Sequence, residues 1–124
     1  STIRRHPDNP EPVLYLAAAW EKSGSKDDAR RVLEAGVSRM PGSGRLHLNL
    51  GRLLAREPGM SEAARDHLIK ARNLMEGNFL PHLSLGDFYF NRNLPKKARR
   101  EWEIAHSLNP GNPDIERRLR ALKR

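Results

Sequence analysis

The sequence predicts an all-α chain in which antiparallel helix pairs are stacked side by side. One two-helix pattern occurs three times between residues 10 and 112. Successive copies are 34 or 35 residues apart, and small residues recur at the same positions in each copy. A single helix pair cannot bury its apolar face alone, whereas stacked copies bury it against one another. These observations favour an array of repeated hairpins.

The first helix of each copy contains a short apolar motif with a small residue at its centre. The motif reads LYLAAAW, LNLGRLL or LSLGDFY, and the central residues are Ala17, Gly51 and Gly86. A glycine inside a helix costs about 1 kcal/mol relative to alanine, so close packing must offset that cost. We therefore expect the three first helices at residues 11–23, 44–56 and 79–92.

The second helix of each copy carries a large residue with one small residue before it and one after it. In the third copy these residues are Ala98, Trp102 and Ala105. The same spacing places the three second helices at residues 27–40, 61–75 and 95–108.

A seventh helix is expected at residues 112–123. Asn112 is a candidate N-cap, and Pro113 suits the first helical position. The acidic Asp114 and Glu116 lie near the positive end of the helix dipole. The few apolar residues of this segment form one stripe, which suits a terminal helix with a solvated outer face.

The pattern resembles the tetratricopeptide repeat family, whose unit is a 34-residue helix–turn–helix with conserved small, large and proline positions. In the copy that starts at Phe79, the matching residues are Leu85, Gly86, Tyr89, Ala98, Trp102, Ala105 and Pro110. The chain departs from the pattern at His82, where the family usually has Trp, and at Glu76, where the second copy lacks the closing Pro.

This resemblance implies a right-handed superhelical array of antiparallel helix pairs. Its repeats would span residues 10–43, 44–78 and 79–112, and a C-terminal capping helix would span 113–124. Residues 1–9 would be the tail of a preceding repeat helix or a linker. Because the chain starts at Ser1 without Met, we expect it to be a fragment of a larger protein.

The net charge of +8 makes acidic peptides, nucleic acids and anionic membrane surfaces plausible partners. The basic excess is spread along the chain, which favours a solvated basic surface over a dedicated arm for polyanions. The cluster KKARR at residues 96–100 is either a site for nucleic acid or an anionic surface, or a solvated face balanced by Glu101 and Glu103. No signal peptide or membrane-spanning segment is visible, and the compartment stays unknown.

No motif for catalysis or metal binding is found. The chain has no cysteine, no nucleophile motif and no phosphate-binding loop. Its five histidines lack the spacings of metal ligands, and His47 and His82 occupy equivalent positions where the family packs a large side chain. We therefore expect no cofactor, no metal and no enzymatic activity.

Binding is the function that the resemblance implies, in a concave groove lined by the first helices. Carried over onto this chain, the candidate partner-binding residues are Leu14, Glu21, Arg45, Leu48, Asn49, Arg52, Arg56, Leu83, Asp87, Phe90 and Arg117. They combine an apolar strip with bordering arginines, which suits a protein or peptide partner with apolar anchors and acidic flanks. The alternative is that these arginines are ordinary solvated groups.

One subclass of the family grips the acidic C-terminal carboxylate of chaperones with Lys, Asn and Arg side chains. At the corresponding positions this chain has Leu14, Ala18, Asn49, Leu80 and Ser84. Only Asn49 matches, so we predict that the chain is not such a clamp.

Two further functions stay open: a nucleic-acid-binding helical repeat, and the regulatory module of an enzyme whose catalytic domain lies elsewhere. Self-association stays open too, because a truncated array can expose an apolar end surface on its N-terminal side.

Overall fold

The computed structural model describes residues 9–122, and these form seven α-helices and no strand. The helices are α1 (Glu11–Lys22), α2 (Lys26–Arg39), α3 (Gly44–Leu54), α4 (Ser61–Leu74), α5 (Phe79–Phe90), α6 (Pro95–Leu108) and α7 (Pro113–Leu122). All seven expected helices are therefore confirmed, with each end within two residues of its predicted position. The predicted tail at residues 1–9 lies, except for Asn9, outside the described residues.

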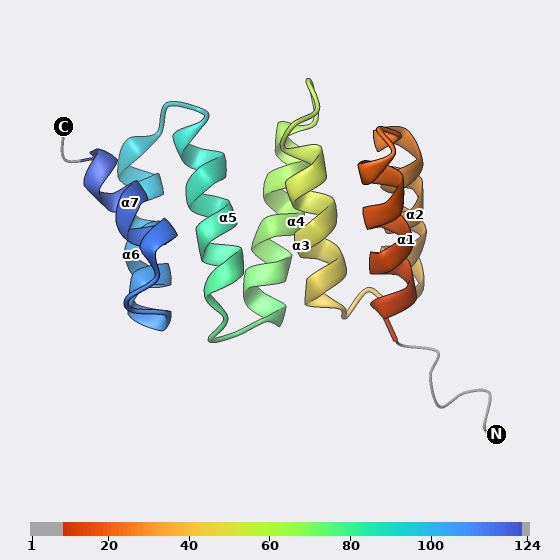
Figure 1. The fold of residues 1–124 in the computed structure, drawn as a ribbon, viewed down its shortest axis with the longest axis horizontal. Coiled ribbons are helices and arrows are strands. Elements are labelled where there is room, and N and C mark those ends of the chain that lie inside the picture. The colour runs from red at the N-terminus through yellow and green to blue at the C-terminus, as the bar shows by residue number, and fades with distance from the viewer. Residues whose placement is uncertain (1–8, 123–124) are drawn as a thin grey trace. The chain divides into compact units, whose positions relative to one another are not determined.

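Figure 1 shows the seven helices as ribbons, and their contacts divide the chain into two compact units. The first ends at Leu74 and contains α1 to α4; the second starts at Met75 and contains α5 to α7. In the first unit α1 pairs with α2, α3 pairs with α4, and α2 also packs against α3. In the second unit α5 pairs with α6, and α7 packs against α6. Each unit thus consists of helix hairpins packed on their sequence neighbours.

Short polar side chains fix the starts of three helices. The Ser43 hydroxyl accepts a hydrogen bond from the Leu46 amide at 3.3 Å, and the Asn78 side chain accepts one from the Leu80 amide at 2.9 Å. The Asn112 side chain accepts from the amides of Asp114 and Ile115 at 2.9 and 3.3 Å, which confirms the predicted N-cap. Each bond satisfies an amide that has no partner inside the first helical turn.

The small residues of the repeat lie where two helices of a pair approach closely. A methyl group on Gly51 would come within 2.8 Å of the Leu68 side chain and 3.1 Å of the Ala64 carbonyl oxygen. A methyl group on Gly86 would come within 2.2 Å of the Trp102 indole. The alanines at the matching positions of α2, α4 and α6 are fully buried. Helix packing therefore accounts for the small residues, as the sequence predicts.

Candidate functional site

The arginine-rich side of α3 is the most distinctive polar surface of the first unit. Arg45, Asn49 and Arg52 are spaced so that they lie on one side of this helix, and Arg56 follows just after its end. The rest of the helix is held in the core, because eight of its eleven residues are buried. The polar stripe is therefore presented by a firmly packed element.

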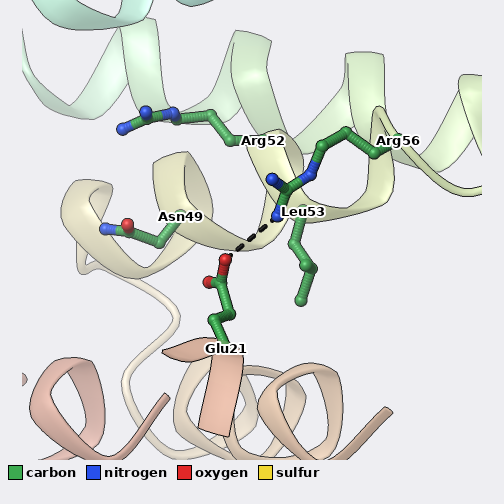
Figure 2. A pocket seen from close by; sticks show the side chains of 5 residues that line it. All are labelled: Glu21, Asn49, Arg52, Leu53 and Arg56. Carbon is green, nitrogen blue, oxygen red and sulfur yellow. Dashed lines mark hydrogen bonds and ion pairs between the residues drawn. The ribbon is translucent and has the colours of Figure 1, made fainter. Parts of the chain in front are cut away.

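A pocket of about 250 Å³ lies beside this stripe (Figure 2). Glu21, near the end of α1, lines it together with Asn49, Arg52, Leu53 and Arg56. Leu53 is only 1% exposed and supplies the apolar part of the lining. The pocket thus combines two cations, an amide and an acid with one apolar contact.

A second hollow of about 180 Å³ adjoins the first, because Glu21 and Asn49 line both. Its other lining residues come from three helices and are Leu14, Ala17, Ala18, Leu33 and Arg45. Four of its seven lining residues are apolar, whereas Leu53 is the one apolar residue among the five that line the first pocket. Together the two hollows bring together six of the seven candidate residues of the first unit, namely Leu14, Glu21, Arg45, Asn49, Arg52 and Arg56.

Leu48 is the exception. Only 4% of its surface is exposed, so it belongs to the core and offers a partner almost no contact area. Its position in the repeat suggested an exposed residue in an apolar strip. The structure corrects that expectation, because α3 is buried on nearly all sides.

Two of the three arginines of the stripe are already paired with acids of α1. Arg45 forms an ion pair with Glu11, and an Arg56 nitrogen lies 3.0 Å from a Glu21 carboxylate oxygen. No ion pair of Arg52 is found within residues 9–122. Figure 2 shows its guanidinium pointing away from the Glu21–Arg56 pair. Arg52 is therefore the cation of this surface that can receive a new carboxylate without displacing one.

In the second unit, Asp87 is engaged in internal contacts. Its carboxylate accepts hydrogen bonds from Arg118 Nε at 2.7 Å and Nη2 at 3.1 Å, and from the Trp102 indole at 3.2 Å. These contacts tie α5 to α7 and α6. Asp87 thus has a structural role, and Arg118 is a contact residue that the sequence did not indicate.

The remaining candidates of the second unit are exposed to different degrees. Phe90 is 46% exposed, and its ring centroid lies 5.5 Å from that of the buried Trp102. Leu83 is half-buried, and Arg117 forms an exposed ion pair with Asp114 on its own helix. Of these three, Phe90 presents the largest apolar surface to a partner.

The basic cluster at the start of α6 is exposed in all four of its cations. Lys97 lies over the Tyr89 ring at 5.5 Å, and Arg99 donates to the Leu122 carbonyl oxygen at 3.4 Å. Trp102, the aromatic residue of the same helix, is 3% exposed and cannot stack on a base. The cluster therefore offers charge without a stacking platform.

Within residues 9–122, no group of three or more His, Asp or Glu side chains could hold a metal ion. None of the helices in this range is long and apolar enough to cross a membrane.

The fold is similar to several solved structures. The type III secretion translocator chaperone SycD of Yersinia enterocolitica matches with a TM-score of 0.81 and 19% identity, over 94% of this chain and 92% of that chain. The first TPR of Spaghetti (RPAP3), bound to an HSP90 peptide, matches with a TM-score of 0.84 and 18% identity, over 94% and 92%. The second TPR domain of human RPAP3, in complex with an HSP70 peptide, matches with a TM-score of 0.79 and 17% identity, over 90% and 92%.

No family model matches the chain, and no curated protein matches it in sequence. The repeat motif, the seven helices and these structural matches agree with one another, and the predicted resemblance is confirmed at the level of the fold. This chain has the all-α fold of tetratricopeptide-repeat domains.

Proposed function

We propose that this chain is a non-enzymatic interaction module that binds a peptide segment of a partner protein along the arginine-rich side of α3. The observation that carries the proposal is that Arg52, which has no ion pair within residues 9–122, lines a hollow that adjoins a second one. Similar structures solved with peptides support it: SycD with a peptide of the translocator YopD, and RPAP3 domains with HSP70 and HSP90 peptides.

The size of the hollows favours peptide side chains over a small-molecule ligand. Pockets for drug-sized ligands usually measure about 300–1,000 Å³. The hollows here, at about 250 and 180 Å³, are smaller and suit single side chains of an extended segment.

The lining sets the chemistry of the partner. An acidic side chain would pair with Arg52, because a guanidinium binds a carboxylate through two parallel hydrogen bonds. An apolar side chain would fill the neighbouring hollow against Leu14 and Leu33. The partner segment should therefore carry an acidic residue close to an apolar one.

Selection from a library of displayed random peptides tests this proposal directly. Peptides selected on the unmodified protein should be enriched in acidic residues next to apolar ones. The double variant R52E/R56E should lose binding to these peptides and keep its helical content, as measured by circular dichroism.

The variant K96E/R100E is the matched control, because it changes the net charge equally on the exposed surface of α6. It should bind the selected peptides like the unmodified protein. Equal losses in both variants would show that total charge, and not the stripe on α3, determines binding.

Chaperone-tail peptides form a second comparison. The peptides SRMEEVD and SGPTIEEVD are bound in two of the similar structures. This chain keeps only Asn49 of the side chains that a tail clamp requires, so we expect both peptides to bind no more tightly than scrambled versions. Tight, sequence-dependent binding would contradict that expectation.

Nucleic-acid binding is the second candidate, favoured by the four exposed cations of α6. Phosphate contacts weaken as salt rises, so RNA or DNA binding should be strongest at low salt. Fluorescence titration with single-stranded RNA at low salt, on the unmodified protein and on K96E/R100E, decides the matter. Negligible binding by the unmodified protein excludes this function.

A further inference from the structure

A pair of histidines lies inside the first unit, between α3 and α4. The Nδ1 atoms of His47 and His67 are 2.9 Å apart, and the two rings are stacked with centroids 5.2 Å apart. The other ring nitrogen of His47 lies 2.8 Å from the Pro41 carbonyl oxygen, in the turn before α3. His47 is 2% exposed and His67 is half-buried. A continuous hydrogen-bonded chain thus links the α2–α3 turn to α4.

The chemistry of this chain fixes where its protons lie. A carbonyl oxygen only accepts hydrogen bonds, so His47 must donate to Pro41 through its Nε2–H. In a neutral His47, Nδ1 is then an acceptor, and His67 must donate to it through Nδ1–H. The chain is satisfied only when both imidazoles are neutral, or when the pair holds a single extra proton.

Added protons disturb this arrangement in two steps. A first proton leaves the hydrogen bond intact but places a positive charge against a buried ring, where desolvation penalises it. A second proton puts an N–H on both Nδ1 atoms, so that two donors face each other at 2.9 Å. The hydrogen bond between the two rings is then lost, and the repulsion acts between α3 and α4.

We propose that the His47–His67 pair is an acid-sensitive joint that loosens the packing of α3 on α4 when the pH falls below neutrality. The inference does not depend on the proposed function. A looser α3 would also affect the proposed peptide-binding surface, because α3 carries Arg45, Asn49 and Arg52.

The charged groups around the His47–His67 pair support a loss of stability at acid pH. The pKa of His67 lies below its ordinary value of 6.5, mainly because burial disfavours the charged form and also because of His47 and Lys70. Asp66 on α4 and Glu34 on α2 act in the opposite sense, but their effect is smaller. At a given pH below 6.5, the unfolded chain therefore binds more protons at His67 than the folded chain. The stabilisation is complete above pH 6.5 and is lost as the pH falls through the folded-state pKa.

The other two repeats provide natural comparisons at the same positions. The first repeat has Val13 and Val32 there, and neither side chain titrates. The third repeat has His82 and Glu101, whose Nδ1 and carboxylate oxygen lie 2.8 Å apart. There the imidazole faces a carboxylate and not a second imidazole. Only the second repeat places two imidazoles against each other.

Hydrogen exchange of individual amides, followed by NMR at several pH values, tests the inference on the full chain. Protection factors, corrected for the intrinsic exchange rate at each pH, should fall several-fold for α3 and α4 between pH 7.5 and 5.0. Amides of α5 and α6 belong to the other compact unit and should keep their protection, which makes them an internal control.

Two variants separate titration from packing. H47V/H67V installs the valine pair of the first repeat, and H67Q keeps a side-chain donor for His47 but does not titrate in this range. In both variants the loss of protection between pH 7.5 and 5.0 should be much smaller than in the unmodified protein. If the unmodified protein keeps its protection in α3 and α4, or if H67Q loses it equally at acid pH, the inference is wrong.

Discussion

Gly86 shows how a single residue sets the distance between two helices. An added methyl group would meet the Trp102 indole at 2.2 Å. That indole cannot move aside easily, because it is 3% exposed and donates a hydrogen bond to Asp87. We expect Gly86→Ala to destabilise the protein by about 1–3 kcal/mol, as overpacked core sites do, despite the better helix propensity of alanine. Urea unfolding followed by circular dichroism measures the change.

Gly42→Ala is the control for this prediction. No atom lies within 4 Å of a methyl group at Gly42, and its backbone is not in the left-handed region. The control should stay within about 0.5 kcal/mol of the unmodified protein. A Gly86→Ala variant that unfolds at the same urea concentration as this control would show that Trp102 has room to move.

Glu21 competes with an acidic partner for Arg56. Its carboxylate lies 3.0 Å from an Arg56 nitrogen, and both side chains are at least 36% exposed. Exposed ion pairs contribute about 0.2–1 kcal/mol, so Glu21→Gln should raise the affinity for the selected acidic peptides by about 1.4-fold to fivefold. Isothermal titration calorimetry measures this change, with Glu103→Gln on α6 as a control of equal charge. Unchanged or weaker affinity for Glu21→Gln would mean that Arg56 takes no part in binding.

Some of these residue contacts could have been predicted from the repeat. Glu11 and Arg45 are 34 residues apart and occupy equivalent positions in successive repeats. Glu21 and Arg56 are 35 residues apart, so Arg56 lies one residue beyond Ala55, the equivalent of Glu21. Opposite charges at equivalent positions of neighbouring repeats predict an ion pair from the sequence. Asp87 and Arg118 are 31 residues apart and share no repeat position, so their contact depends on how the side chains are oriented.

At the scale of the helix, position was more predictable than burial. The N-cap residues and the regular spacing of small residues fixed every helix to within two residues. Burial depends on how many neighbours cover a helix, and a repeat position does not contain that information. This is why Leu48 was expected on an exposed strip and is only 4% exposed.

Arg118 connects α7 to α5, whereas the neighbouring Arg117 forms its ion pair within α7. Arg118 binds both carboxylate oxygens of Asp87 on α5, at 2.7 and 3.1 Å. Both side chains are about one third exposed, so solvent screening reduces the contribution of this pair to about 1 kcal/mol. Arg118→Gln should therefore lower hydrogen-exchange protection in α7 while α5 keeps most of its protection.

Arg117→Gln is the matched control on the same helix. Arg117 pairs with Asp114 within α7, and both side chains are more than 60% exposed. Its replacement should change α7 protection very little. Equal effects of the two substitutions would mean that the Asp87 contact does not hold α7 in place.

For the molecule as a whole, the repeat predicts the architecture and leaves the partner open. Recurring spacings define the helix pairs, because every pair must satisfy the same packing constraints. The proposed binding surface depends instead on residues that vary between repeats, such as Arg52, whose equivalents in the other two repeats are Ala18 and Asp87. Those residues carry no repeated signal, which is why the sequence suggests a class of partner and no individual one.

Apolar side chains of α1 are exposed at positions that are buried in the second repeat. Leu16 and Trp20 are 49% and 37% exposed, whereas the equivalent Leu50 and Leu54 of the second repeat are each 1% exposed. Tyr15, beside them, is 74% exposed. Contiguous exposed apolar surface of this kind favours association. We therefore expect concentration-dependent self-association, seen in sedimentation equilibrium as an average mass that rises above 14.1 kDa.

The double variant L16K/W20K should remain monomeric over the same concentration range, because two charges on this face oppose its burial. The control I104K/L108K changes two residues of similar exposure, 37% and 41%, on α6. It should associate like the unmodified protein. If the control also becomes monomeric, the added charge and not the face of α1 controls association. If the unmodified protein is monomeric at every concentration, the exposed α1 face does not drive self-association.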